Sequence, residues 1–456
     1  MNVAWVNFAA DIGPGTTNLT AFRTMFDSIR VNGGNSMRLW LHTTGASTPE
    51  FNSNGFVVGP GNNAIADLRA ILDLAWERHV GLVLCLWSFD MLLMSRGSTI
   101  TDRAMLLLTD TSAITAYTDN ALAPMVDAVR GHPGIIAWEV FNEAEGMSDE
   151  FGWGDVYHVP MATIQRFVNR VAGAIHRSDP AAQVTTGAWS FISQSDATPP
   201  GGAAGVIPPA QAIASEERAR IENEFLARYG ISESAEDILS RFEVAANSNY
   251  YSDNRLIAAG GDPLGTLDFY TVHYYDWAGT ALSPFHHPSS TWQLTKPLVI
   301  AEFYLNDAFG VSYGDMFENL YSAGYAGALT WQWANGGTQV ARTKVAMRDL
   351  VALHPADIVV SAKLFVDQPA SGFELFQNYP NPFNPSTTIA FSIPRREYVS
   401  LVIFDILGRL VETVAEGVYE PGRYQVTWNA GPFASGIYVY RLQTAGAFLG
   451  RKLMVM

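Results

Sequence analysis

Cysteine, positive charge and long apolar runs are all scarce in this chain of 456 residues. The single cysteine, Cys85, excludes a disulfide within the chain, and its position in the apolar segment Gly81–Trp87 favours a packing role over a nucleophile. Only 28 basic residues stand against 44 acidic ones. Because nucleic acids and anionic membranes attract Lys/Arg clusters, this balance argues against either as the partner.

No apolar run approaches the roughly 18 residues of a membrane-spanning helix, so no transmembrane segment is expected. A charged start followed by an apolar segment is also missing, since the chain begins almost inside a predicted strand, Val3–Phe8. We therefore expect that a signal peptide is missing from this sequence. Neither Cys-x-x-Cys nor His-Glu-x-x-His occurs, and neither a metal ion nor a cofactor is expected.

Up to about residue 350, short apolar segments alternate with amphipathic ones. Eight segments are predicted strands: Val3–Phe8, Ser36–Leu41, Gly81–Trp87, Ile135–Phe141, Gln183–Trp189, Phe269–Tyr274, Leu298–Phe303 and Ala326–Trp333. Predicted helices between them include Leu19–Val31, Ala64–Arg78, Ala113–Val129, Met161–Arg177 and Asp315–Ala323. Polar residues follow nearly every strand, which favours a parallel (β/α)8 TIM barrel over an open doubly wound sheet.

One connection, from Ser193 to Thr266, is unusually long for such a barrel. It contains a Pro/Gly segment and two charged helical stretches, Ser215–Tyr229 and Ala235–Phe242. Loops of this length on a compact domain often carry function, here as a wall or lid beside a cleft. The alternative, given equal weight, is an insertion that has no part in function.

After His354-Pro355 the helical periodicity stops, and short strands rich in Val, Ile, Tyr and Phe alternate with Gly/Pro/Asn turns. The expected strands are Thr387–Ile393, Val399–Ile406, Tyr424–Trp428, Gly436–Leu442 and Phe448–Met454. This pattern suits a small all-β, Ig-like sandwich. The expected organisation is therefore a barrel over residues 1–354, a linker over 355–371 and a sandwich over 372–456.

Two of the predicted strands end in carboxylates. The segment Ile135–Phe141 runs into Asn142-Glu143, and Leu298–Phe303 contains Glu302. Two carboxylates at strand ends of one barrel suit retaining glycoside hydrolysis, in which one is the acid/base and the other the nucleophile, about 5–5.5 Å apart. Glu139 and Glu145 are rivals to Glu143, but Glu139 would lie deeper in the packed barrel and Glu145 is already in the following loop.

Other polar residues at strand ends fit the same site. Arg38 would be costly to bury unpaired, and we expect it to hold a carboxylate, Glu302, in bidentate contact. A structural ion pair at the barrel end is the alternative. The amide of Asn142 could bond a sugar hydroxyl, and alternation places His273, Tyr275 and Trp277 on one rim.

Tryptophans also gather at the strand ends, and aromatic rings bind the apolar faces of sugars. These expected platforms are Trp40, Trp87, Trp189, Trp277, Trp331 and Trp333.

Taken together, Arg38, Asn142-Glu143, His273-x-Tyr275, Glu302 and Trp331 occur in the order expected of family-five glycoside hydrolases, which residues 1–350 resemble. The resemblance implies a (β/α)8 barrel, with Glu143 as acid/base and Glu302 as nucleophile. It also implies His273 near the acid/base, Tyr275 near the nucleophile and Trp331 as the platform under the sugar at the cleavage point.

Two details of the strands indicate which substrate the resemblance favours. The Trp-Glu-x-x-Asn-Glu form of Trp138 to Glu143 is more similar to the family's β-mannanases, and the His that many of its cellulases carry near the third strand is replaced by Leu86-Trp87-Ser88-Phe89-Asp90. This favours a retaining endo-β-1,4-mannanase, with an endo-β-1,4-glucanase as the alternative. A surface glycan-binding protein that has lost catalysis is the alternative from another class.

The tail resembles a second family. Its segments Phe373–Ile389, Phe404–Arg409 and Ala434–Tyr440 are similar to the C-terminal sorting domain of the type nine secretion system. The resemblance implies a bacterial protein that is secreted or attached to the cell surface, with the outer-membrane secretion machinery as partner. A carbohydrate-binding sandwich is the alternative, although its only tryptophan, Trp428, lies in an alternating strand and is expected in the core.

Overall fold

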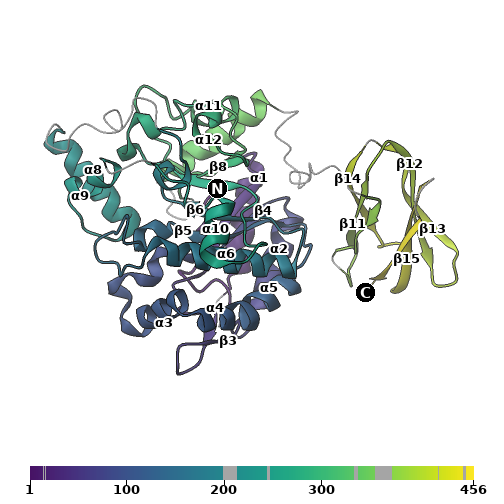
Figure 1. Cartoon of the computed structure of the whole chain (residues 1–456). Coiled ribbons are helices and arrows are strands. Elements are labelled where there is room, and N and C mark those ends of the chain that lie inside the picture. The colour runs from purple at the N-terminus through teal and green to yellow at the C-terminus, as the bar shows by residue number, and fades with distance from the viewer. Residues whose placement is uncertain are drawn as a thin grey trace. The chain divides into compact units, whose positions relative to one another are not determined.

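The computed structural model describes residues 1–13, 15, 17–198, 213–243, 247–332, 337–354, 372–379, 381–419, 421–444 and 448–455. The chain divides into two compact units, Met1–Val360 and Ser361–Met456 (Figure 1). Each unit has its own apolar core. The linker expected over 355–371 lies outside the described residues.

Parallel strands form the central sheet of the first unit, in the order β1-β4-β5-β6-β7-β8-β9. Their bounds are β1 Ser36–Thr43, β4 Gly81–Ser88, β5 Ile135–Asn142, β6 Val184–Ala188, β7 Tyr270–His273, β8 Leu298–Glu302 and β9 Gly327–Ala328. A short hairpin of β2 (Glu50–Phe51) and β3 (Val57–Gly59) lies apart from this sheet. Seven of the eight expected strands therefore have counterparts, the last one much shorter than expected.

The remaining expected strand, Val3–Phe8, is wrong in its bounds. Only the chain start makes strand-like contacts: Asn2 forms a parallel bridge with Arg38, and the backbone N–H of Asn2 donates to the carbonyl of Thr330 at 3.0 Å. These bonds connect the two edges of the sheet, β1 and the segment that directly follows β9. The first unit is therefore a closed barrel of the (β/α)8 type.

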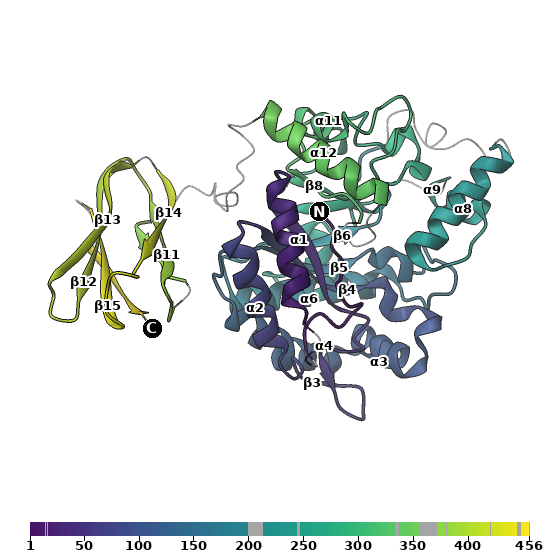
Figure 2. The ribbon, with the colours of Figure 1, turned by 180° about the vertical axis from the view of Figure 1, so that it is seen from behind.

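Helices surround the barrel (Figure 2). Their bounds are α1 Leu19–Val31, α2 Ala64–Glu77, α3 Ser98–Thr109, α4 Thr111–Tyr117, α5 Ala123–Ala128, α6 Met161–Ser178, α7 Phe191–Gln194, α8 Ser215–Tyr229, α9 Ala235–Glu243, α10 Asp253–Gly260, α11 Met316–Ser322 and α12 Gly337–Leu353. The helix expected over Ala113–Val129 is divided into α4 and α5 by a π-helical turn, Thr118–Leu122.

Helix α1 illustrates why these segments form as they do. The side chain of Asn18 accepts a bond from the backbone N–H of Ala21 and so caps the first turn. Phe22, Phe26 and Ile29 follow at helical spacing, and all three are buried. An outward polar face and an inward apolar stripe therefore fix this helix on the barrel.

The second unit is built of two antiparallel sheets, β10-β11-β14 and β13-β12-β15-β16. The bounds are β10 Glu374–Leu375, β11 Ser386–Ile393, β12 Glu397–Asp405, β13 Leu410–Tyr419, β14 Gly422–Asn429, β15 Gly436–Gln443 and β16 Phe448–Val455. The five strands expected here are present. Trp428 is buried in the shared core, as expected, and does not form a surface platform.

Within the described residues, no helix combines the length and apolar character that crossing a membrane requires.

Candidate active site

Glu143 stands at the first position after β5, where the strand turns into the loop. Its backbone is left-handed, with φ 49° and ψ 49°. This conformation costs a residue with a side chain about 1–2 kcal/mol, and such strain gathers at functional positions. A bond of 2.8 Å from the N–H of Glu143 to the carbonyl of Gly187 holds the turn in place. The turn aims the carboxylate into the barrel mouth rather than along the strand.

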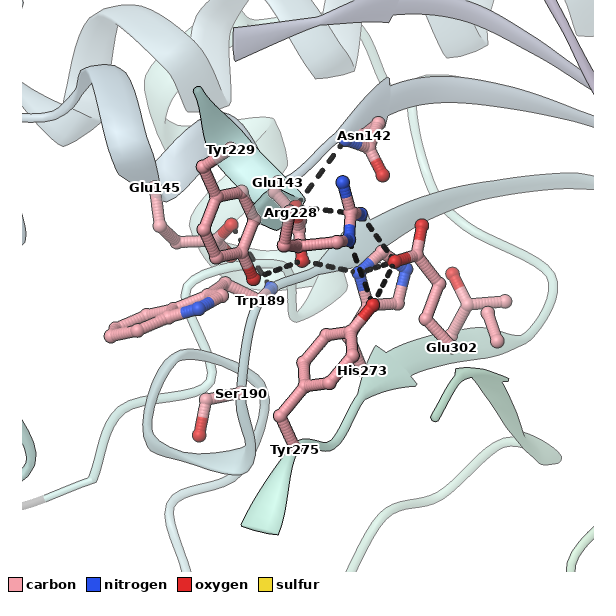
Figure 3. Close-up of polar contacts among 12 residues, drawn as sticks. Asn142, Glu143, Glu145, Trp189, Ser190, Arg228, Tyr229, His273, Tyr275 and Glu302 are labelled. Carbon is pink, nitrogen blue, oxygen red and sulfur yellow. Dashed lines mark hydrogen bonds and ion pairs between the residues drawn. The ribbon is translucent and has the colours of Figure 1, made fainter. Parts of the chain in front are cut away.

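Glu143, His273 and Glu302 converge at the ends of β5, β7 and β8 (Figure 3). One ligand atom of each lies within 4.8 Å of the others, so the carboxylates of Glu143 and Glu302 approach to that distance. The separation fits the retaining geometry of about 5–5.5 Å and not the 6.5–9.5 Å of inverting enzymes. Nδ1 of His273 lies 2.7 Å from Glu143 Oε1. Both carboxylates are fully buried.

Arg38 contacts more partners than the sequence predicted. Its Nε and Nη2 donate to Glu139 at 2.6 and 2.7 Å, whereas only Nη1 donates to Glu302, at 2.6 Å. The bidentate partner is therefore Glu139, and the expected bidentate pair with Glu302 is wrong. Nη2 also donates to Asn142 Oδ1 at 2.9 Å. Arg38 thus connects its deep ion pair with Glu139 to the carboxylate of Glu302.

A glycine in the neighbouring strand makes room for this ion pair. A Cβ on Gly187 of β6 would lie 2.3 Å from Glu139 Oε1 and 3.1 Å from Arg38 Nη2. Both distances are too short for unbonded atoms at ordinary contact. The absence of a side chain at this position therefore allows Arg38 and Glu139 to pair at the barrel centre.

Replacing Arg38 by methionine should destabilise the protein by about 3–5 kcal/mol, because it leaves the buried carboxylate of Glu139 without its partner. Denaturant unfolding of the two proteins measures this difference. The matched control is Arg130→Met, which removes an exposed pair with Asp127 and should change stability by less than about 1 kcal/mol. Equal losses in the two variants would contradict the structural role of Arg38.

The surroundings of Glu302 favour its ionised form. Burial by itself would raise the pKa of this carboxyl, but the neighbouring side chains of Arg228, His273 and Arg38, with a bond from the Tyr275 hydroxyl, lower it to about 2. The Tyr275 hydroxyl donates to Glu302 Oε2 at 2.7 Å. A carboxylate that stays charged at neutral pH and lies at the reacting centre is suited to act as a nucleophile.

This low pKa predicts a pH dependence of stability. Because the pKa of folded Glu302 lies near 2, below its ordinary 4.5, its ionised form stabilises the fold fully above pH 4.5, and this stabilisation is lost as the pH falls toward 2. Thermal unfolding of wild type and Glu302→Gln between pH 6 and 3 should show wild type losing more stability as the pH falls. Parallel pH profiles would contradict this role of the charge.

The aromatic platforms fall into two groups. Trp331 and Trp40 lie together, with ring centroids 5.8 Å apart, and Trp277 stacks on Tyr275 at 4.6 Å. Trp87 is buried among His42 and Tyr117, and Trp189 among Trp153 and Phe242. Trp331, Trp40 and Trp277 thus lie against side chains that contact Glu302, namely Arg228, Arg38 and Tyr275. Trp87 and Trp189 instead pack in the walls. Trp333 lies outside the described residues.

Neither rival of Glu143 is free for catalysis. Glu139 is occupied by Arg38 at the barrel centre, as described above. Glu145 accepts bonds from Ser193 Oγ at 2.8 Å, the Tyr251 hydroxyl at 2.9 Å and the N–H of Trp189 at 3.2 Å. Asn142, besides Arg38, contacts Ser88 Oγ at 3.2 Å and Glu143 Oε2 at 3.4 Å. These contacts hold the strand end and the following loops in register around Glu143.

Two site residues come from the long connection and were not predicted. Helix α8 ends at Tyr229, and its last two side chains enter the site. The Tyr229 hydroxyl donates to Glu143 Oε1 at 3.2 Å. Arg228 forms ion pairs with both Glu143 and Glu302 and donates through Nε to the Tyr275 hydroxyl at 2.8 Å (Figure 3). The long connection from Ser193 to Thr266 therefore contributes residues to the site and is not an insertion without a role there.

The same three groups, Glu143, His273 and Glu302, are close enough to hold a metal ion. Two guanidinium groups, of Arg38 and Arg228, already form ion pairs with Glu143 and Glu302. A cation would have to displace or approach these like charges, so the charge distribution suits carboxylate chemistry better than a metal centre.

Comparison with curated proteins finds relatives of the first unit. A mannan endo-1,4-β-mannosidase of Mytilus edulis is 34% identical over 353 residues, which are 72% of this chain and 82% of the relative. A mannan endo-1,4-β-mannosidase of Cryptopygus antarcticus is 29% identical over 361 residues, which are 74% of this chain and 80% of the relative.

Solved structures and family models give the same division of the chain. The crystal structure of an endo-1,4-β-mannanase from Eisenia fetida is similar with a TM-score of 0.60 and 33% identity, covering 77% of this chain and 90% of that one. Residues 377–456 match the model of the secretion system C-terminal sorting domain. The resemblances of barrel and tail are therefore both confirmed.

Proposed function

Because this chain belongs to the mannan endo-1,4-β-mannosidase family of glycoside hydrolases, we propose that it cleaves β-1,4-linked mannan internally and retains the configuration at the anomeric carbon. Glu302 is the nucleophile and Glu143 the acid/base. The observation that carries this assignment is the approach of their carboxylates to within 4.8 Å at the ends of β5 and β8.

In the first step, Glu302 attacks the anomeric carbon while Glu143 gives a proton to the oxygen of the departing sugar. A covalent glycosyl-enzyme forms and the glycosidic bond breaks. Arg38 Nη1 and the Tyr275 hydroxyl bond different oxygens of Glu302, which fixes the plane of the carboxylate for this attack. The ring of Trp331 offers a platform for the sugar being attacked.

In the second step, the same groups act in reverse. Glu143, now ionised, takes a proton from a water molecule, and the water oxygen displaces Glu302 from the anomeric carbon. His273 Nδ1 contacts Glu143 Oε1 at 2.7 Å and so orients the carboxylate in both steps. Two inversions at the same carbon give net retention.

The direct test is release of reducing sugar, with product sizes, from β-mannan and from a soluble β-1,4-glucan in parallel. The Glu302→Ala protein serves as blank. Mannan cleaved to a range of oligomers supports the proposal, and proton NMR of the first product should show the β-anomer. Cleavage of glucan alone would make the chain an endo-glucanase of the same mechanism. If neither polysaccharide releases reducing sugar, a glycan-binding role is favoured.

The tail implies export. Its match to the sorting domain means that the protein is a cargo of a secretion system and is secreted or displayed on the cell surface. More specifically, we propose that the outer-membrane machinery of the type nine system recognises the second unit, and that a signal peptide first delivers the chain to the periplasm. Deleting residues 372–456 in a host with this system should leave the enzyme inside the cell envelope.

A further inference from the structure

The place of the sugar at the cleavage point is taken by a side chain of the protein itself. The guanidinium carbon of Arg228 lies 3.7 Å from the ring centroid of Trp331. This is a stacking distance, so a sugar ring cannot lie on that face of Trp331 at the same time. The Arg228 side chain is only 2% exposed, and it closes the space between the two carboxylates (Figure 3).

Arg228 contacts the same groups that would contact the reacting sugar. One nitrogen, Nη2, pairs with Glu143 and with Glu302, and Nε donates to Tyr275, which itself donates to Glu302. The transition state of retaining hydrolysis is a planar, positively charged oxocarbenium-like ring between the same two carboxylates. A guanidinium is likewise planar and positively charged. Arg228 therefore occupies the site as an internal stand-in for the charged sugar.

The element that carries Arg228 is attached to the barrel mainly through side chains. Phe225 and Tyr229 of α8 pack on Trp153 with ring centroids 5.5 and 4.4 Å apart, and Arg220 pairs with Asp276 at 3.1 Å. Gly230 follows α8 with φ +69°, so the chain turns away directly after the two residues that enter the site. Such an arm can withdraw without breaking a strand of the barrel.

We propose that α8 is a closing arm displaced by substrate. Without glycan, Arg228 and Tyr229 hold both carboxylates and shut the cleavage point. An entering glycan replaces the Arg228 guanidinium on Trp331, and the withdrawal frees Glu302 Oε2 for attack. The glycan's identity rests on the proposed function, but the closure itself depends only on the contacts above.

The binding test compares wild type with Arg228→Ala, using mannobiose in calorimetry. If the arm is closed in more than about nine of ten free molecules, apparent affinity is reduced by that fraction, and Arg228→Ala should bind mannobiose about tenfold more tightly or better. The control is Arg218→Ala, which removes an arginine of the same helix that pairs with Glu236 outside the site. The control should bind as wild type does. Equal or weaker binding by a folded Arg228→Ala protein would overturn the proposal.

Amide hydrogen exchange of Ser215–Tyr229 provides a test without sugar. Exchange should be slow in wild type, faster in Arg228→Ala, and faster in wild type once mannobiose is bound. Unchanged protection in both cases would overturn the closing arm. If β-mannan is not cleaved but Arg228→Ala loosens α8, the proposed function fails and the closure stands. If β-mannan is cleaved but α8 shows the same exchange in all states, the proposed function stands and the closing arm is refuted.

Discussion

Replacing Glu302 by alanine is expected to reduce turnover of β-mannan by about 10⁴- to 10⁶-fold, the range seen when an enzyme loses its covalent nucleophile. No other carboxylate can replace it, because Glu139 is bound by Arg38 and Glu145 by the hydroxyls of Ser193 and Tyr251. Initial rates of reducing-sugar release measure the loss, and circular dichroism shows whether the fold is kept.

A small anion distinguishes the loss of the nucleophile from damage to the site. Azide fits the space left by the carboxylate of Glu302, and with an activated aryl β-mannoside it should restore the rate and give the α-mannosyl azide. The inverted product identifies the face from which Glu302 attacks. A Glu302→Ala protein with near wild-type activity would refute the assignment.

Replacing Glu143 by alanine should lower the rate on mannan by about 10²- to 10⁴-fold, since proton transfer to the leaving oxygen is lost. The loss should depend on the substrate. An aryl mannoside with a good leaving group needs little protonation, so its first step should be nearly normal and the glycosyl-enzyme should accumulate.

The matched control for this variant is Glu145→Ala. Glu145 is an equally buried glutamate two positions further along, but its bonds go to Ser193, Tyr251 and the N–H of Trp189. Its removal should lower stability without producing a dependence on the leaving group. Mass spectrometry detects the accumulated intermediate in Glu143→Ala. If both variants lost activity equally on all substrates, Glu143 would not be the acid/base.

Much of the barrel was predictable because its strands are buried apolar runs with a polar end. The strand expected over Val3–Phe8 failed for a local reason that hydrophobicity does not reveal. The carboxylate of Asp11 accepts bonds from the N–H groups of Val6 and Asn7 and bends the chain there. In the second unit, β13 was missed because Leu410–Tyr419 shows no regular alternation of buried and exposed residues.

The closeness of Glu143 and Glu302 was predictable for the same reason, since each of them stands at the end of an apolar strand. The partner of Arg38 was not, because Glu139 and Glu302 are both within reach of its side chain and only the register of β1, β4 and β5 decides between them. Arg228 gave no signal at all. The length of the connection suggested a wall or lid beside the cleft, but an arginine in a charged helix is ordinarily solvated, and no pattern singled out Arg228 within Ser215–Tyr229.

The missing side chain at Gly187 constrains how this protein can evolve. Alanine at this position is incompatible with Arg38 and Glu139 as they stand, while the loss of either charge alone leaves the other buried without its partner. A change at any one of the three positions therefore disrupts the buried ion pair and lowers stability. Across relatives, a side chain at the position of Gly187 should occur only where the arginine–glutamate pair has also been replaced. Directed evolution of this barrel would have to replace Arg38 and Glu139 together before it could place a side chain at Gly187.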